Sequence, residues 1–162
     1  MNVLRPVDAE EKPAFWSMLA DYLVEHARMA DPDGRYNPLD MPTYDLYWGE
    51  DHRCPCWIVD AAGVPAGLAL VNDRYAPSGS AVDHGLVEFY VAPARRRTGL
   101  GLAAAHELFV TLFGWWELQV SLRNPGALAF WPRAIEAANP TAWEQIATPD
   151  TVIHRFRAPA VT

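Results

Sequence analysis

Residues 87–106 read VEFYVAPARRRTGLGLAAAH and form the most informative stretch of the sequence. Its β-branched and aromatic beginning predicts a half-buried strand that ends at Ala92-Pro93, because proline cannot donate to a ladder. A basic turn then leads into Gly99-Leu100-Gly101 and an alanine- and leucine-rich run that is typical of a helix. Free N–H groups and the helix dipole both favour negative charge at a helix N-terminus, so the stretch indicates an anion site.

The glycine spacing alone does not say which anion binds. Gly99-x-Gly101-x-x-Ala104 matches the loose dinucleotide fingerprint, which also requires glycine directly after the strand and an acidic residue ~20 positions later. Here seven residues separate Val91 from Gly99, and the next strand carries Gln119 and Ser121 near the required position. We therefore set aside a nicotinamide-binding enzyme. An ordinary strand–helix connection with a solvated basic turn stays open as the structural alternative.

A longer string covers the same turn and is more specific. Val91-x-Pro93-x-x-Arg96-x-x-Gly99-x-Gly101 resembles the acetyl-CoA signature of the GNAT family of N-acetyltransferases. In that family the arginine and the two glycines wrap the pyrophosphate of acetyl-CoA. The resemblance implies direct acetyl transfer from acetyl-CoA to a primary amine of a small molecule or peptide, without an acyl-enzyme.

A second block of resemblance follows the next predicted strand. Asn124-x-x-Ala127-x-x-Phe130-Trp131 is similar to the family's Asn-x-x-Ala-x-x-Phe-Tyr, whose asparagine contacts the pantetheine arm or orders the loop beside it. The family's tyrosine often returns a proton to the departing thiolate. Trp131 stands at that position, and an indole N–H is a donor that does not act as a proton-transfer acid. The Phe130-Trp131 pair can equally be explained as core packing.

The resemblance assigns a set of residues to the cofactor. They are Phe89, Tyr90, Val91, Arg96, Arg97, Thr98, Gly99, Leu100, Gly101, Leu102, Asn124, Phe130 and Trp131. It implies that the turn contacts the pyrophosphate chiefly through main-chain N–H groups. It also implies that main-chain N–H groups at residues 89–91, where the fourth strand splays from the fifth, face the developing oxyanion.

For catalysis we single out Glu88 and Asn124. Glu88 sits in an otherwise apolar strand beside the expected thioester site, where partial desolvation would raise its pKa and suit it to take a proton through water. A carboxylate that pairs with an arginine is the structural alternative. Glu117 and His84 are weaker candidates for the base.

The acceptor site is the least defined part of the prediction. The region after the first helix usually shapes acceptor specificity in this family, and here it carries an aromatic group. The residues we assign to the acceptor are Tyr36, Tyr44 and Trp48. Aromatic packing that closes one end of the core explains the same residues.

The order of predicted elements extends the resemblance over nearly the whole chain. We expect strands at residues 2–7, 56–60, 66–71, 87–91, 116–122, 141–146 and 152–157. We expect helices at residues 8–27, at 44–48, from the glycine turn to about 113, and at 126–138. Pro132 should kink the last helix or restart it at Trp131. This is the family's order, so we predict one α/β (α+β) domain over residues 1–162. Its acyl-CoA N-acyltransferase-like fold has a mixed, mostly antiparallel, splayed sheet flanked by helices.

Composition restricts the remaining classes of function. A formal net charge of −7 argues against a nucleic-acid surface, and no apolar run is long enough to span a membrane. The start MNVLRPVDAEEK lacks the apolar core of a signal peptide, so we expect a cytoplasmic protein. Cys54 and Cys56 lack the second pair that a structural zinc site needs, so no metal is expected. A homodimer is possible from the resemblance, and a non-catalytic acyl-CoA-binding module is the alternative function.

Overall fold

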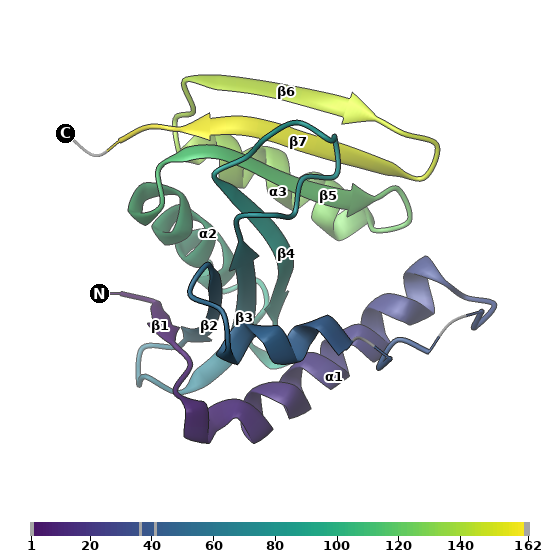
Figure 1. The fold of residues 1–162 in the computed structure, drawn as a ribbon, viewed down its shortest axis with the longest axis vertical. Helices are drawn as coiled ribbons and strands as arrows, with labels where there is room; N and C mark the ends of the chain where they lie inside the picture. Colours follow the sequence, from purple (N-terminus) through teal and green to yellow (C-terminus); the bar gives the residue numbers. More distant parts are fainter. Residues whose placement is uncertain (1, 36, 41, 161–162) are drawn as a thin grey trace.

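One seven-stranded sheet organises the chain, in the order β1-β2-β3-β4-β5-β7-β6 (Figure 1). The computed structural model describes residues 2–35, 37–40 and 42–160. Its strands are β1 (Leu4–Pro6), β2 (Arg53–Val59), β3 (Pro65–Asn72), β4 (His84–Val91), β5 (Gly114–Ser121), β6 (Ala142–Ala147) and β7 (Thr151–Ala158). Its α-helices are α1 (Lys12–Ala30), α2 (Leu100–Thr111) and α3 (Pro125–Ala137), and its 3₁₀ helices are η1 (Ala9–Glu11), η2 (Pro42–Trp48) and η3 (Pro93–Arg95).

The sheet is antiparallel except where β4 meets β5. These two strands are parallel, and their ladder consists of only two residue pairs, His84 with Trp116 and Gly85 with Glu117. Beyond Gly85 the strands diverge, so the sheet opens between them. The mixed, mostly antiparallel and splayed sheet that the sequence predicts is therefore confirmed.

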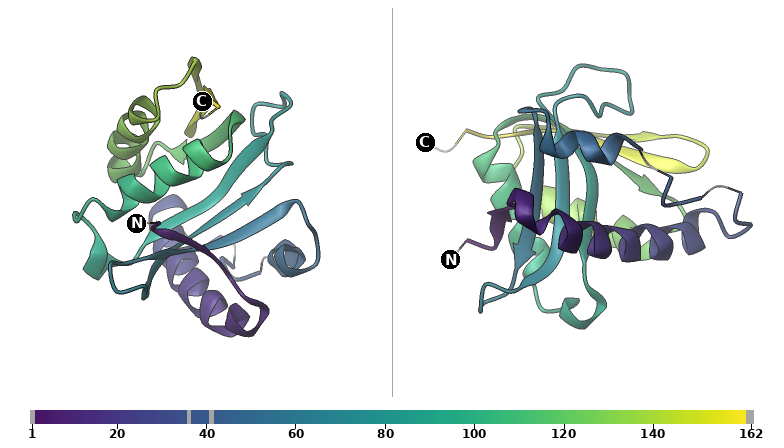
Figure 2. Two further views of the ribbon diagram at one scale, coloured as in Figure 1. Left: turned by 90° about the vertical axis from the view of Figure 1, so that its left-hand side faces the viewer. Right: turned by 60° about the horizontal axis from the view of Figure 1, so that its bottom comes forward.

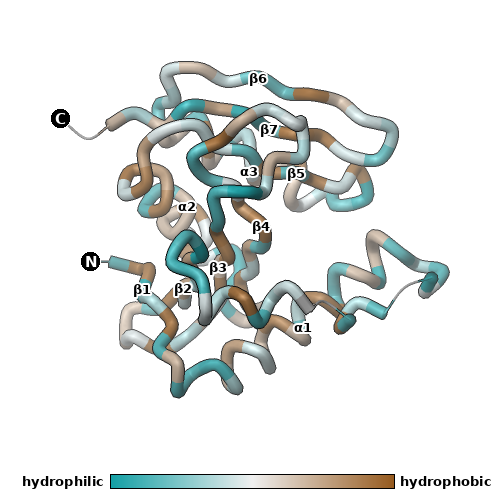
Figure 3. Tube along the Cα trace, in the orientation of Figure 1, coloured by the Kyte–Doolittle hydropathy of each residue, from teal (hydrophilic) through white to brown (hydrophobic). Residues whose placement is uncertain are grey.

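Helices cover both faces of the sheet. Figure 2 shows α1 and η2 on one face and α2 with α3 on the other. Each face has its own buried cluster: Phe15, Leu19, Trp57 and Leu68 lie on the α1 side, and Phe109, Trp116, Ile135 and Phe156 lie on the α2–α3 side. The central strands β3 and β4 are the most apolar part of the sheet (Figure 3), because both of their faces are covered.

The first helix follows from its sequence pattern. Glu11 accepts a hydrogen bond from the Asp8 backbone N–H at 3.1 Å, as expected of a capping pair, and the apolar stripe then buries Phe15, Leu19 and Leu23. Full burial of each such side chain contributes roughly 1.5–3 kcal/mol, so this stripe fixes α1 on the sheet. The same helix carries Tyr22 toward the site described below.

The last helix lies where the sequence predicts it, and it continues past Pro132 to Ala137. The Asn124 side chain accepts from the Ala127 N–H at 2.9 Å, and Pro125 occupies the first helical position. The expected restart at Trp131 is wrong, because α3 runs through Pro132 as one element. Its buried face, which includes Trp131 and Ile135, packs on the sheet on both sides of the proline.

A β-bulge in β4 sets which side chains face which layer. Leu70 pairs with Glu88 and Val71 pairs with Leu86, so Val87 is an extra residue on β4. Leu86 consequently packs in the α2–α3 cluster, whereas Glu88 faces the α1 side, where it meets Tyr44. A regular strand would direct both side chains to the same face.

Candidate functional site

The opening between β4 and β5 contains a cavity of about 100 Å³, which we call the splay cavity. It is bordered by α1 on one side and α3 on the other, so it connects the two faces of the sheet. Its lining residues are Tyr22, His26, Leu86, Val87, Phe89, Leu118, Gln119, Val120, Ser121, Asn124, Ala127 and Trp131. Of the predicted site residues, Phe89, Asn124 and Trp131 are therefore brought together.

The turn before α2 has the backbone that an anion site requires. Gly99 has a φ of 86° and directly precedes α2, and Arg97 has a φ of 65°, which is uncommon for a residue with a side chain. Thr98 donates from Oγ1 to the Arg95 carbonyl at 2.7 Å and closes the turn. A Cβ at Gly101 would lie 3.4–3.6 Å from Val91 and Phe130, so this glycine brings the helix close to β4 and α3.

The three arginines of the turn have different surroundings. Arg95 pairs with Asp60 at 2.8 Å. Arg96 pairs with Glu25 of α1 at 2.8 Å, donates from Nε to the Val91 carbonyl and lies over the Tyr90 ring. Arg97 is the one member of the trio that has no acidic partner among the described residues. The Arg96 side chain therefore ties the turn to α1, whereas Arg97 is the arginine of the turn whose charge is left unpaired by the described residues.

Glu88 lies among tyrosines. Tyr44 donates to Glu88 Oε1 at 2.6 Å, and the Tyr22 hydroxyl is the second side-chain donor that faces this carboxylate. Burial raises the pKa of Glu88 above its usual value, and the hydrogen bonds from Tyr44 and Tyr22 oppose that rise. The alternative in which Glu88 pairs with an arginine is wrong, because the partners of this carboxylate are hydroxyls.

Tyr22 and His26 of α1 were not predicted as site residues. Their rings lie 5.7 Å apart, and both line the splay cavity. Burial and the neighbouring Glu88 raise the pKa of Tyr22 well above its usual value, and burial lowers the pKa of His26. In the sequence, Tyr22 recurs at helical spacing with Phe15 and Leu19, which puts it on the sheet-facing stripe of α1 without telling which part of the sheet it meets.

The second resemblance block forms the opposite wall. Asn124 caps α3 and borders the cavity, so its side chain fixes the start of the helix that carries Trp131. Trp131 is 7% exposed and packs edge-on against Phe89, with ring centroids 5.0 Å apart, and against Phe130 at 4.9 Å. The wall formed by α3 thus presents an amide and an indole to the cavity, and no acidic side chain.

The weaker candidates for the base have other partners. Glu117 is fully buried and accepts from Arg155 Nη1 at 2.7 Å, from the Ser78 N–H at 3.0 Å and from the Ser78 hydroxyl. Its contacts hold the loop of residues 73–83 across β5 and β7. His84 lies against the Trp116 ring and within 3.1 Å of the Phe113 carbonyl. Both residues are thus engaged in packing or ion pairs outside the splay cavity.

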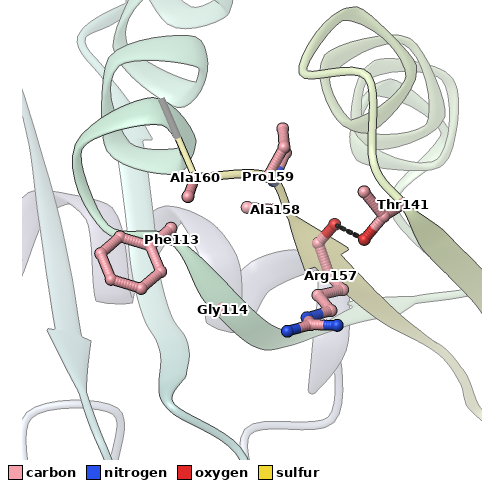
Figure 4. Close-up of a pocket in the computed structure, with 7 residues that line it drawn as sticks. All are labelled: Phe113, Gly114, Thr141, Arg157, Ala158, Pro159 and Ala160. Atoms are coloured by element: carbon pink, nitrogen blue, oxygen red, sulfur yellow. Dashed lines mark hydrogen bonds between the residues drawn. The ribbon is translucent and has the colours of Figure 1, made fainter. Parts of the chain in front are cut away.

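Two of the predicted acceptor residues, Tyr44 and Trp48, both belong to η2 but contact different side chains. Tyr44 is buried and contacts Glu88, whereas Trp48 packs edge-on against Phe15 at 5.5 Å. Tyr36 lies outside the described residues. A larger hollow of about 460 Å³, lined by residues that include Phe113 and Arg157, lies at the ends of β5 and β7 (Figure 4). It shares no lining residue with the splay cavity.

Within residues 2–35, 37–40 and 42–160, no group of three or more histidine, cysteine, aspartate or glutamate side chains could hold a metal ion. None of the described helices is both long and apolar enough to cross a bilayer.

Comparison with known proteins agrees with this geometry. A sequence model of the acetyltransferase (GNAT) family matches residues 16–135. No curated protein is significantly similar in sequence.

Solved structures share the fold. An acetyltransferase from Thermus thermophilus has 18% identity and a TM-score of 0.64, with 97% of this chain and 99% of that chain covered. A spermidine N-acetyltransferase from Vibrio cholerae, in complex with CoA and spermine, has 12% identity and a TM-score of 0.64 over 96% and 94%. The Escherichia coli ribosomal-protein-S18-alanine N-acetyltransferase has 15% identity and a TM-score of 0.61 over 100% and 97%.

Proposed function

The chain belongs to the GNAT family of acetyltransferases, and on this basis we propose that it binds acetyl-CoA and transfers the acetyl group directly to a primary amine. The observation that carries the proposal is the divergence of β4 from β5, together with the positive φ of Gly99 in the turn that joins β4 to the N-terminus of α2. One end of this arrangement suits a pyrophosphate and the other suits a thioester. Glu88 lies next to the opening, on the face opposite α3.

The residues of the turn fit the charged part of acetyl-CoA. The first turn of α2 has free N–H groups, and the positive φ of Gly99 allows the backbone to curve around an anion. Arg97 supplies an exposed cation that no acidic side chain of the described chain neutralises. Gly101 has no Cβ between α2 and the neighbouring strand, so the turn stays close to the splay cavity.

The splay cavity fits the thioester end of acetyl-CoA. When bound, acetyl-CoA would supply an activated acyl group as a thioester. Beyond Gly85, the β5 side of β4 has no strand partner in the described chain, so main-chain N–H groups near residues 89–91 are free to face a developing oxyanion. Asn124 would orient the pantetheine arm by holding the start of α3.

We assign the role of base to Glu88. Its raised pKa makes the carboxylate a stronger proton acceptor near neutral pH than an exposed glutamate. Tyr44 holds the carboxylate in place at 2.6 Å. The amine acceptor would reach Glu88 from the face that carries α1 and η2, where Tyr44 forms part of the wall.

The proposed acceptor is a primary amine of a small molecule or a peptide. Both kinds are named for proteins of the same fold, a spermidine N-acetyltransferase and a ribosomal-protein-S18-alanine N-acetyltransferase. The net charge of −7 favours a cationic acceptor over an anionic one.

The test is acetyl transfer from acetyl-CoA across a panel of polyamines, amino acids and peptide N-termini. Glu88→Gln should lower kcat at least about 100-fold, the usual contribution of a general base. Glu136→Gln, which changes an exposed carboxylate on α3, is the matched control and should keep full activity. If coenzyme A binds tightly, no amine is acetylated and Glu88→Gln changes nothing, the chain is a non-catalytic acyl-CoA-binding module instead.

A further inference from the structure

The α3 wall of the splay cavity lacks a proton donor suited to a departing thiolate. Trp131 fills the place where the related motif has tyrosine, and its indole is held between Phe89 and Phe130. The Asn124 side chain is engaged as the cap of α3. If the sulfur is protonated by a side chain, that side chain must come from another wall of the cavity.

Three other groups that carry a dissociable proton line the cavity. They are Tyr22 and His26 of α1 and Ser121 of β5. Ser121 already accepts a hydrogen bond from the Arg123 N–H at 3.2 Å, and an aliphatic hydroxyl is a far weaker acid than a phenol. Burial lowers the pKa of His26, so the imidazole is neutral and carries only one N–H near pH 7.

Tyr22 differs from the other two because its hydroxyl also faces Glu88. Its ring lies 5.3 Å from the ring of Tyr90 on β4 and 5.7 Å from His26, so both α1 and the splayed strand position it. Tyr22 thus borders both the splay cavity, where we place the thioester, and the carboxylate of Glu88, which we propose as the base for the amine. No other hydroxyl among the described residues has both properties.

We propose that Tyr22 is the catalytic acid of this protein and passes its hydroxyl proton to the sulfur of coenzyme A, in place of the tyrosine that Trp131 replaces. The assignment rests on the proposed acetyl transfer. As the C–N bond to the amine forms, an N–H bond of the amine breaks and Glu88 gains that proton. The C–S bond breaks, the Tyr22 O–H bond breaks and an S–H bond forms. The proton on Glu88 then returns to the Tyr22 oxygen, so the protein ends as it began.

The charge on Glu88 would set the order of these transfers. While Glu88 is ionised, the low solvation of the phenol and the charge of Glu88 together keep the pKa of Tyr22 high, so the phenol holds its proton. Once Glu88 accepts the proton of the amine, that charge disappears and the phenol becomes a stronger acid. The sulfur would therefore receive its proton only after the amine has lost one.

The first experiment measures the ionisation of bound coenzyme A and needs no acceptor. The thiolate absorbance of coenzyme A bound to the protein is titrated from pH 6 to pH 10, with S-methyl coenzyme A as the blank. A donor at the sulfur stabilises the thiolate, so Tyr22→Phe should raise the pKa of the bound thiol by about 1 unit, as expected for loss of a hydrogen bond to a charged group. Tyr47→Phe, a buried tyrosine outside the splay cavity, is the matched control and should leave the pKa of the thiol unchanged.

The second experiment measures turnover. Tyr22→Phe should lower kcat about 100-fold with KM for acetyl-CoA within threefold, because the phenyl ring keeps the wall of the cavity and only the proton is lost. Tyr47→Phe should change neither constant.

The outcomes separate the two proposals. If the bound thiol titrates at the same pH in the wild type and in Tyr22→Phe, Tyr22 is not at the sulfur and the assignment is wrong, even if amines are acetylated. If the titration shifts but no amine is acetylated, the contact with sulfur holds and the proposed function fails. If coenzyme A does not bind, both proposals fail.

Discussion

The ion pair between Glu117 and Arg155 should be the most sensitive polar contact of the fold. These residues face each other directly across β5 and β7, and Glu117 is fully buried. The carboxylate also accepts two hydrogen bonds from Ser78, so it joins the loop of residues 73–83 to the sheet. Replacing Glu117 by leucine removes all three contacts and leaves the Arg155 guanidinium, which is 13% exposed, without its closest acidic partner.

The size of the effect follows from the burial of the pair. Removing one partner of a buried ion pair costs about 3–5 kcal/mol, because the remaining charge is left unpaired in a poorly solvated place. Arg155 keeps the Ala81 carbonyl at 2.9 Å, the Trp115 ring at 4.6 Å and Glu144 at 3.8 Å, so we expect the lower end, about 3 kcal/mol. For a chain of this length that lowers Tm by roughly 6–12 °C.

A double-mutant cycle measures this coupling. Glu117→Leu, Arg155→Met and the double variant are unfolded with urea, and the free energies of unfolding are compared. Each single variant should lose about 3 kcal/mol, and the double variant should be far more stable than the sum of the two losses predicts, because no unpaired charge remains. Losses below about 1 kcal/mol for both single variants, or strictly additive losses, would show that Glu117 and Arg155 do not depend on each other for stability.

Three further predictions concern single side chains. Gly99→Ala should lower the free energy of unfolding by about 1 kcal/mol, because the φ of Gly99 is 86°. Gly101→Ala should be neutral or stabilising, because the added Cβ would meet only ordinary van der Waals contacts. Equal urea midpoints for the two variants would contradict this difference. The raised pKa of Glu88 means that its ionised form is disfavoured in the folded state. The stability of the wild type should therefore fall relative to that of Glu88→Gln as pH rises through the pKa of Glu88 in the folded protein. A difference in Tm between the two proteins that stays constant from pH 4 to pH 9 would contradict this prediction. Burial raises the pKa of Cys56 to about 12 and also raises the pKa of Cys54. Iodoacetamide at pH 7.5 should therefore label both thiols much more slowly in the native protein than in the urea-unfolded protein. Equal labelling rates in the two states would show that these thiols are exposed.

Much of the fold could be predicted from local sequence signals. The glycine turn and the strand before it each depend on a few adjacent residues and lie where expected. The pair Asn124-Pro125 is likewise a local signal for the start of a helix, and α3 begins there. Phe15, Leu19 and Leu23 recur at helical spacing in the sequence, so the buried stripe of α1 is likewise a local signal. The restart expected at Trp131 was wrong because Pro132 removes only one helical hydrogen bond, and this loss did not outweigh the burial of the α3 face on both sides of the proline.

The arrangement of the site depends on contacts between distant segments. The bulge at Val87 turns Glu88 toward α1, and only the pairing of β3 with β4 reveals it. Tyr22 reaches the splay cavity because α1 crosses the opening between β4 and β5, which the spacing of its own residues does not indicate. Arg96 has the residue type of a phosphate ligand, yet its side chain is held by Glu25, which lies 71 positions earlier.

The location of bound coenzyme A is the strongest test of the proposed cofactor site. A crystal structure of the protein grown with coenzyme A should show the pyrophosphate at the N–H groups that begin α2, and the pantetheine arm in the splay cavity between β4 and β5, with the sulfur near Tyr22 and Glu88. Density for coenzyme A in the hollow lined by Phe113 and Arg157, with the splay cavity empty, would contradict the account.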